Sequence, residues 1–180
     1  HDDQHGTAIV TLAALINALK VVNKAIENVR IVFNGAGAAG VAVARLLRKG
    51  GVRYISMCDS KGLLSFDRPG LTEEKREFAV EKGGSLADAL VGADVFIGLS
   101  VPQPELVVDD VAVIATGRSD YPNQINNVLA FPGIFRGALD CRAKTITQTM
   151  YLEAAQAIAA LVKPSDLDRE NIIPSVFDDR

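Results

Sequence analysis

The sequence contains few cysteines, no basic cluster and no apolar run long enough to cross a membrane. Only two cysteines, Cys58 and Cys141, occur in 180 residues, which favours buried thiols in the reducing cytosol over a disulfide framework. The net charge of −3 and the pI near 5.4 argue against a nucleic-acid-binding surface. The most apolar stretch, residues 8–22, is interrupted by polar residues such as Asn17 and Lys20, so it predicts a core helix and no membrane span.

The length and composition fit one globular domain. Of the 180 residues, 48% are hydrophobic and 23% are charged, which is enough for a sizeable core. The chain begins without methionine, inside what reads as a motif at residues 1–7. We therefore expect residues 1–180 to form one domain of a longer polypeptide.

The strongest pattern lies at residues 30–59. Residues 30–34, rich in β-branched and aromatic side chains, predict a strand that leads into the sequence GAGAAG. Apolar residues at helical spacing follow, and a second apolar run at residues 52–58 predicts a strand that ends at Asp59. A glycine turn alone is more often only a tight structural turn. Strand, glycine turn, helix, strand and acid in this order favour a site for a dinucleotide.

Each glycine of the turn has a separate expected role. Gly35 allows a sharp turn off the strand, Gly37 lets the backbone approach a pyrophosphate, and Gly40 lets the helix lie close to the strand. Backbone N–H groups at the positive end of the helix would then bind the phosphates. The predicted phosphate-binding residues are Gly35, Ala36, Gly37, Ala38, Ala39 and Gly40.

The residues after the second strand are expected to contact the adenosine ribose. Asp59 falls at the tip of that strand, where its carboxylate can accept hydrogen bonds from the ribose hydroxyls. Ser60 and Lys61 follow it and belong to the same predicted site. Lys61 is either a solvated lysine or a group that attracts a 2′-phosphate. Both NAD and NADP therefore stay open as cofactors.

Two adjacent acids precede the first predicted helix, which should start near Thr7. Asp3 or Thr7 could cap that helix, and the acids could simply stabilise its dipole. Alternatively, Asp3 binds a divalent metal ion and Asp2 is a neighbouring or catalytic carboxylate, since hard cations prefer oxygen ligands. His1 and His5 lack the helical spacing and the Glu of a zinc site, so we interpret them as polar residues without a metal-binding role rather than as metal ligands.

The later segments extend the predicted sheet. Residues 93–99 and 111–116 read as apolar strands, and the proline-containing loop at 101–105 should lie at the carboxyl end of the first of these, where ligands bind. Four to five parallel strands are expected. The predicted fold class is α/β, a Rossmann-like doubly wound, mostly parallel sheet in a three-layer α/β/α arrangement.

A segment rich in amides lies at residues 121–133. Its adjacent Asn126 and Asn127 offer both donors and acceptors, as recognition of a small hydroxy or keto acid requires. The alternative is that they are turn-forming residues near a helix start.

Three segments together resemble the malic enzyme family, particularly its bacterial members. They are HDDQHGTA at residues 1–8, NGAGAAG at 34–40 followed by CDSKG, and ATGRSDYPNQINNVLAFPG at 115–133; the tail IIPSVFD is also similar. The resemblance implies that Asp3 binds Mg²⁺ or Mn²⁺ and that Asp2 is the neighbouring catalytic carboxylate, partnered by a lysine outside this chain. It also implies that Thr7 lies near the dinucleotide and that Asn127, with Asn126, contacts the malate carboxylate.

The activity implied by the resemblance is oxidation of L-malate to pyruvate and CO₂ with hydride transfer to NAD or NADP. It also implies an N-terminal catalytic domain outside this chain and a homo-dimer or larger oligomer in the cytoplasm. Two alternatives stay open: conversion of malate to lactate, and a non-catalytic NAD(P)-binding module for sensing or assembly.

The sequence departs from the family pattern near residues 100–104. Family members have a strand–helix–strand passage of roughly thirty residues before the ATG segment, whereas here Ser100 and Val101 run directly into Pro102. Either part of the substrate site is lost, or the sequence joins separate pieces. We favour the second interpretation, because removing a crossover unit would leave a gap in the sheet.

Overall fold

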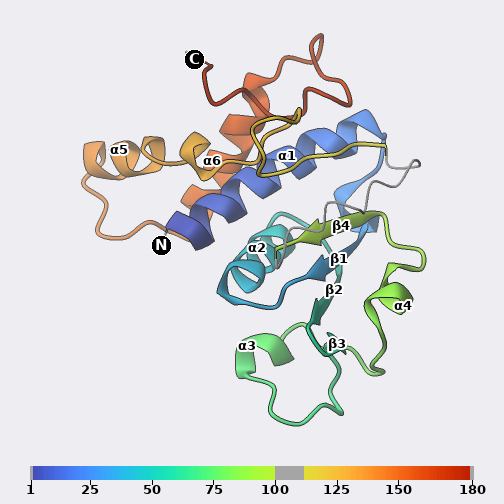
Figure 1. The fold of residues 1–180 in the computed structure, drawn as a ribbon. Coiled ribbons are helices and arrows are strands. Elements are labelled where there is room, and N and C mark those ends of the chain that lie inside the picture. The colour runs from blue at the N-terminus through green and yellow to red at the C-terminus, as the bar shows by residue number, and fades with distance from the viewer. Residues whose placement is uncertain (1, 100–111, 179–180) are drawn as a thin grey trace. The chain divides into compact units, whose positions relative to one another are not determined.

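The computed structural model describes residues 2–99 and 112–178, without the side chains of Asp2 and Asp3 (Figure 1). The chain divides into two compact units. We call Ala25–Leu106 the sheet unit, and His1–Lys24 together with Val107–Arg180 the helical unit.

The sheet unit contains four strands in the order β3-β2-β1-β4. Strand β1 pairs in parallel with β2 and with β4, and β3 pairs antiparallel with β2. The strands are β1 (Arg30–Asn34), β2 (Tyr54–Asp59), β3 (Gly62–Leu63) and β4 (Val95–Gly98), and the helices are η2 (Ile26–Asn28), α2 (Ala38–Lys49), α3 (Glu73–Arg76) and α4 (Leu86–Leu90).

Strand β1 lies at the centre of this sheet because its side chains are apolar on both faces. Ile31, Val32 and Phe33 are all buried, as expected for a strand between two parallel neighbours. The connection through α2 leads from β1 to β2, and the connection through α4 leads back across β1 to β4. Right-handed crossovers in opposite directions place their helices on opposite faces, as Figure 1 shows for α2 and α4. The doubly wound, mostly parallel sheet is confirmed.

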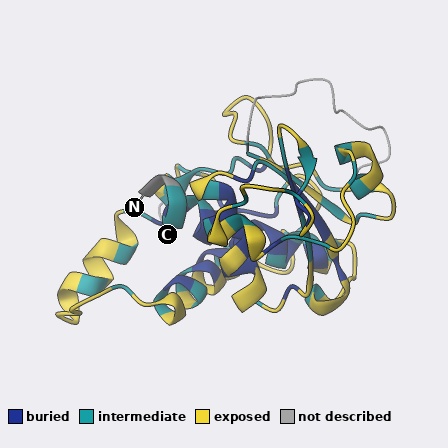
Figure 2. Cartoon of the chain, turned by 90° about the horizontal axis from the view of Figure 1, so that it is seen from below, coloured by how far each residue is buried: buried dark blue, intermediate teal, exposed yellow. Residues whose placement is uncertain are grey.

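The helical unit is built around the pairing of α1 (Thr7–Val21) with α6 (Gln148–Leu161). Nine residues of α1 are buried, which confirms the predicted core helix, whereas α5 (Gly133–Asp140) has none; Figure 2 is coloured by this burial. The shorter elements are η1 (Asp2–Gly6) and η3 (Asn127–Leu129). In the part of the chain that the structure describes, no helix is long and apolar enough to cross a membrane.

The predicted strand at residues 111–116 is wrong over its described part. Residues 112–116 form no strand, and only Thr116 makes an isolated bridge, to Gln124. The Thr116 carbonyl accepts from the Ile125 N–H at 2.8 Å. The segment therefore pairs with the loop that follows it, and the sheet has three parallel strands and a short antiparallel edge. The loop predicted at 101–105 lies outside the described residues.

Two smaller predictions also need correction. The helix does begin at Thr7, but neither Thr7 nor Asp3 occupies its N-cap, which is Gly6 in a helical conformation. Because η1 continues directly into α1, no free helix end is present there to be capped. Cys58 is buried as expected, but Cys141 is exposed because it follows α5, which has no buried residue.

A buried amide joins three segments of the helical unit. The Asn17 side chain in α1 donates to the carbonyl oxygen of Ala159 at 2.8 Å and to that of Ile172 at 2.9 Å. Its own oxygen accepts from the Lys20 ammonium at 3.0 Å. One side chain thus satisfies backbone carbonyls of α6 and of the C-terminal tail. In that tail, the side chains of Ile172 and Ile173 are buried.

Replacing Asn17 by the isosteric Leu should destabilise the protein. The Ile172 carbonyl would lose the donor that Asn17 provides, and the Ala159 carbonyl would keep only the Val162 N–H at 3.3 Å; an unsatisfied buried group costs about 1–3 kcal/mol. We expect a loss of about 3 kcal/mol in the free energy of unfolding, measured by urea denaturation. The control is Gln156→Leu on the exposed side of α6, expected within about 0.5 kcal/mol of wild type. Equal stability of Asn17→Leu and wild type would contradict this role.

Candidate functional site

The glycine turn leaves β1 between its two neighbouring strands. Gly35 has φ of 135°, a conformation that favours glycine, and its N–H donates to the carbonyl oxygen of Cys58 at 2.9 Å. The turn is therefore tied to the end of β2. The order of the sheet reverses at β1, and ligands of doubly wound sheets bind at this reversal, beyond the carboxyl ends of the strands.

The other two glycines meet different surroundings. A Cβ atom at Gly40 would overlap the carbonyl oxygen of Gly35, so α2 can approach the turn only because position 40 has no side chain. A Cβ atom at Gly37 would meet nothing within 4 Å, because this backbone faces open space. The surroundings of Gly40 agree with its predicted role in packing α2 close to the strand. The open space at Gly37 is what the approach of a pyrophosphate would need.

The first turn of α2 presents backbone donors to the same space. Its N-cap is Gly37 in an extended conformation, and no side chain caps the helix. The first N–H groups of a helix lack partners within it and carry the positive end of the dipole. Ala38 is exposed and Ala39 half-buried, whereas Ala36 is buried. We call Gly35–Gly40 and the uncapped start of α2 the phosphate cradle. Its backbone N–H groups suit the phosphates of a dinucleotide, and no side chain would have to move.

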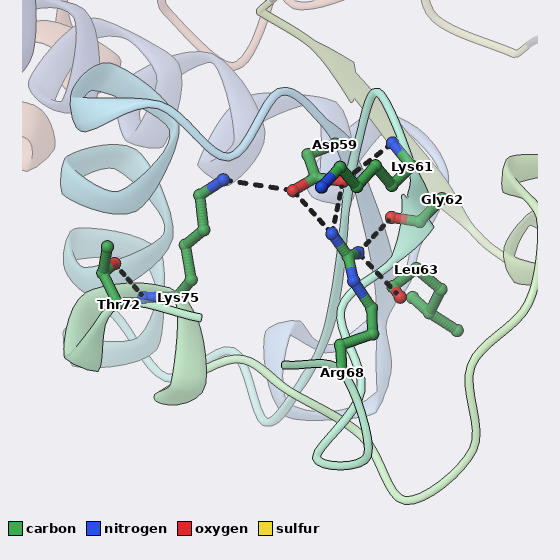
Figure 3. A network of polar contacts seen from close by, with 7 residues as sticks. All are labelled: Asp59, Lys61, Gly62, Leu63, Arg68, Thr72 and Lys75. Carbon is green, nitrogen blue, oxygen red and sulfur yellow. Dashed lines mark hydrogen bonds and ion pairs between the residues drawn. The ribbon is translucent and has the colours of Figure 1, made fainter. Parts of the chain in front are cut away.

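Asp59 stands at the tip of β2 and is bound on both carboxylate oxygens (Figure 3). One guanidinium nitrogen of Arg68 donates to both oxygens at 3.0 Å, and the Lys75 ammonium donates to Oδ2 at 3.1 Å. The Lys61 backbone N–H donates to Oδ1 at 2.9 Å. We call Asp59, Arg68 and Lys75 the ribose-side cluster.

The charge of Asp59 is maintained by these donors. Burial would raise the pKa of its carboxyl group, but the hydrogen bonds from Lys61, Lys75 and Arg68 lower the pKa below its ordinary value. The lowered pKa of Asp59 agrees with the geometry, because three donor groups make four hydrogen bonds to its two oxygens. Asp59 is thus ionised near pH 7.

Sequence reasoning missed Arg68 and Lys75. Both lie in the polar segment after β2, and neither belongs to a motif. Arg68 also donates to the carbonyl oxygens of Gly62 and Leu63, each at 3.2 Å, and so fixes β3. Of the predicted residues, Lys61 contributes its backbone N–H while its side chain is exposed, and Ser60 is exposed.

The helical unit brings together the acidic and the amide segments. Helix η1, which contains Asp2 and Asp3, contacts η3, which begins at Asn127. At this contact a Cβ atom on Gly6 would lie 2.9 Å from the Asn127 Cβ atom. Segments more than a hundred positions apart in the sequence therefore meet, as a shared substrate site requires.

The two adjacent asparagines have different surroundings. The Asn126 side chain accepts from the Val128 N–H at 3.0 Å and caps η3, so its observed contact is that of a turn-forming residue. Within the described part of the chain, the half-buried side-chain amide of Asn127 makes no hydrogen bond. Asn127 is thus the better candidate for binding a ligand.

The metal-binding prediction has no test in the described side chains. No group of three His, Cys, Asp or Glu side chains gathers in the described ranges, and the side chains of Asp2 and Asp3 lie outside them. His5 stacks on Tyr151 with ring centroids 5.0 Å apart, and burial lowers the pKa of His5. His5 therefore packs against an aromatic ring of α6. His1 lies outside the described residues, and the proximity of Thr7 to a dinucleotide stays a prediction.

Comparison with known proteins identifies the relatives of this chain. The model of the family "Malic enzyme, NAD binding domain" matches residues 4–100 and 108–179. The Bifunctional malic/malolactic enzyme of Bacillus subtilis (strain 168) is 48% identical over all of this chain and 52% of its own length. The NAD-dependent malic enzyme of Geobacillus stearothermophilus is 46% identical, over 44% of its length, and the NADP-dependent malic enzyme of Escherichia coli (strain K12) is 42% identical, over 28% of its length.

Solved structures agree on the fold. The malic enzyme of Entamoeba histolytica superposes on 99% of this chain with a TM-score of 0.92 at 37% identity, which covers 45% of that protein. The malic enzyme of Pyrococcus horikoshii gives a TM-score of 0.90 at 38% identity, over 99% of this chain and 51% of that protein. The chain spans about half the length, or less, of the curated relatives named here.

The family match is interrupted between residues 100 and 108, where the sequence departs from the family pattern. The alignment to the Bacillus subtilis relative runs over 214 positions, although this chain has 180 residues. That relative therefore holds residues without a counterpart here. The interpretation that the sequence joins separate pieces stays a prediction.

Alanine at Gly40 should lower stability, whereas alanine at Gly37 should lower dinucleotide affinity. Gly40→Ala forces the helix away from the Gly35 carbonyl and should cost about 1–3 kcal/mol of stability, as overpacking does. Gly37→Ala should retain stability within about 1 kcal/mol, yet bind a dinucleotide roughly tenfold more weakly, because its methyl group stands over the phosphate-facing backbone. Urea denaturation and titration calorimetry measure the two effects. Unchanged affinity in Gly37→Ala would contradict the proposed phosphate cradle.

Proposed function

The chain belongs to the malic enzyme family, whose NAD-binding domain it contains, and we propose that the whole protein converts L-malate to pyruvate and CO₂ with reduction of NAD(P)⁺. The observation that carries this proposal is the contact of η1 with η3 at Gly6 and Asn127. It joins the paired acids to the amide segment in one unit. Two of the relatives named above are an NAD-dependent and an NADP-dependent malic enzyme.

The reaction consists of four actions, in which this chain's residues would take part. The C2 hydroxyl of malate would lose its proton and C2 would lose a hydride, which would give oxaloacetate. The bond between C3 and the adjacent carboxylate then breaks, CO₂ leaves, and protonation at C3 gives pyruvate. The cofactor accepts the hydride, whereas the protein positions the reacting atoms.

The site residues would take the following roles. The glycine turn and the N-terminus of α2 would hold the pyrophosphate of the cofactor. The Asn127 amide would donate to a malate carboxylate. Asp2 would accept a proton, together with a lysine from outside this chain.

We propose Asp3 as a ligand of Mg²⁺ or Mn²⁺, supported by the family resemblance and by the preference of these ions for oxygen. A bound divalent cation would place positive charge at the C2 oxygen of malate. We further propose that the protein is a homo-oligomer, which the resemblance supports, and that it is cytoplasmic, which the two free cysteines support.

A second candidate is conversion of malate to lactate. The Bacillus subtilis relative, 48% identical over this whole chain, carries the name of a bifunctional malic/malolactic enzyme. The same site would serve if pyruvate stayed bound and received the hydride back from the reduced cofactor. Lactate would then leave without net reduction of NAD(P)⁺.

Asp3→Ala in the complete protein should abolish metal-dependent turnover. We expect the rate of NAD(P)H formation from malate to fall at least about 100-fold. The reason is that the variant would lose the positive charge that the metal ion places at the C2 oxygen. Dinucleotide affinity, measured by calorimetry, should stay within about twofold. Asp67→Ala, an exposed acid in the sheet unit, serves as the control and should keep wild-type rates. Retained activity in Asp3→Ala would remove Asp3 from the metal site.

The products distinguish the two candidate reactions. With L-malate, Mn²⁺ and a catalytic amount of cofactor, a malic enzyme stops once the oxidised cofactor is consumed, whereas malolactic conversion continues and accumulates lactate. We expect pyruvate and reduced cofactor in equal amounts, followed over time by absorbance and chromatography. Lactate in large excess over cofactor would establish the second candidate instead.

A further inference from the structure

The carboxylate of Asp59 is the residue expected to accept hydrogen bonds from the cofactor ribose. An ionised carboxylate offers about four acceptor sites. Here Oδ1 accepts from Lys61 and Arg68, and Oδ2 accepts from Arg68 and Lys75. All of its acceptor sites are therefore occupied. A ribose hydroxyl could bind Asp59 only by displacing one of these donors.

The two cations outweigh the acid that they surround. Arg68 and Lys75 each carry one positive charge against the single negative charge of Asp59. Their side chains are 19% and 31% exposed, and that of Asp59 is 15% exposed. The ribose-side cluster thus presents net positive charge in a partly buried position, where charges interact more strongly than in bulk water.

Arg68 and Lys75 differ in how many donors remain for a ligand. Arg68 uses one terminal nitrogen on Asp59 and the other on the carbonyl oxygens of Gly62 and Leu63. Lys75 donates one of its three N–H groups to Asp59. Lys75 is therefore the member of the ribose-side cluster with donors to spare.

Lys75 is also held in place without Asp59. It belongs to α3, whose N-cap Thr72 accepts from the Lys75 N–H. Glu77, directly after that helix, forms ion pairs with Arg45 at 2.8 Å and Arg48 at 3.0 Å on α2. The helix that bears Lys75 is thus fixed to the helix that follows the glycine turn.

From these contacts we infer that the ribose-side cluster selects the 2′-phosphate of NADP, with Lys75 as the contacting residue and Asp59 as a positioning residue for Arg68 and Lys75. A phosphate ester carries close to two negative charges and three strong acceptors, which the spare ammonium donors of Lys75 suit. The unmodified ribose of NAD brings neutral hydroxyls to a carboxylate already saturated with donors. This inference rests on the proposed binding of NAD(P) at the glycine turn.

The complete protein should bind NADP at least about tenfold more tightly than NAD in titration calorimetry at low ionic strength. The ratio should fall toward one as salt rises to 0.5 M, because the selecting interaction is a charge pair. Lys75→Gln should weaken NADP about tenfold and change NAD less than about twofold. Lys49→Gln, at the opposite end of α2, removes the same charge and should change neither.

Asp59→Asn separates the two roles of the acid. If Asp59 only positions Arg68 and Lys75, the NAD affinity of the variant should stay within about twofold of wild type. If Asp59 binds the ribose directly, the NAD affinity should fall by about tenfold or more. Wild-type protein that binds NAD as tightly as NADP, or Lys75→Gln that weakens both equally, would overturn the inference. Far-UV circular dichroism confirms that each variant is folded, and the salt dependence of the wild type provides a test without any variant.

These measurements use binding and no turnover. Preference for NADP without malate-dependent reduction would leave the inference standing and contradict the proposed reaction. Malate oxidation with equal use of NAD and NADP would support the proposed reaction and contradict the inference about the ribose-side cluster.

Discussion

The close approach of α2 to the turn after β1 is the constraint on which the sheet unit depends. Position 40 can hold only glycine, because any Cβ atom would overlap the carbonyl oxygen of Gly35. This approach directs the first turn of α2 toward open space at Gly37 and brings the turn against the end of β2 through the bond from Gly35 to Cys58. A cofactor site then follows from backbone geometry alone, and Asp59 is placed beside it.

What surrounds Asp59 changes how this kind of site works. An acid at the tip of the second strand is expected to read the ribose hydroxyls, but here four hydrogen bonds occupy its oxygens. Arg68 also donates to the carbonyl oxygens of β3, and the Lys75 ammonium is held at Asp59 (Figure 3). The acid thereby becomes the anchor of a cationic site. A residue type that identifies the fold need not contact the ligand in the usual way.

The sequence predicted the elements that local patterning defines. Strand, glycine turn, helix and strand at residues 30–59 were predicted correctly because their periodicity is local. Arg68 and Lys75 could not be found, because only the folded loop brings them to Asp59. The apolar run at 112–116 resembles a strand, yet a strand requires a partner, and here the partner is the following loop. The meeting of η1 with η3 likewise depends on tertiary packing between distant segments, although the family resemblance had pointed to both.

The most direct test is the reaction catalysed by the complete protein that contains this chain. Supplied with L-malate, Mn²⁺ and either cofactor, it should release pyruvate, CO₂ and reduced cofactor in equal amounts, with NADP used in preference to NAD. Failure to oxidise malate under these conditions, with dinucleotide binding intact, would contradict the assignment of the acids and amides to a malate site.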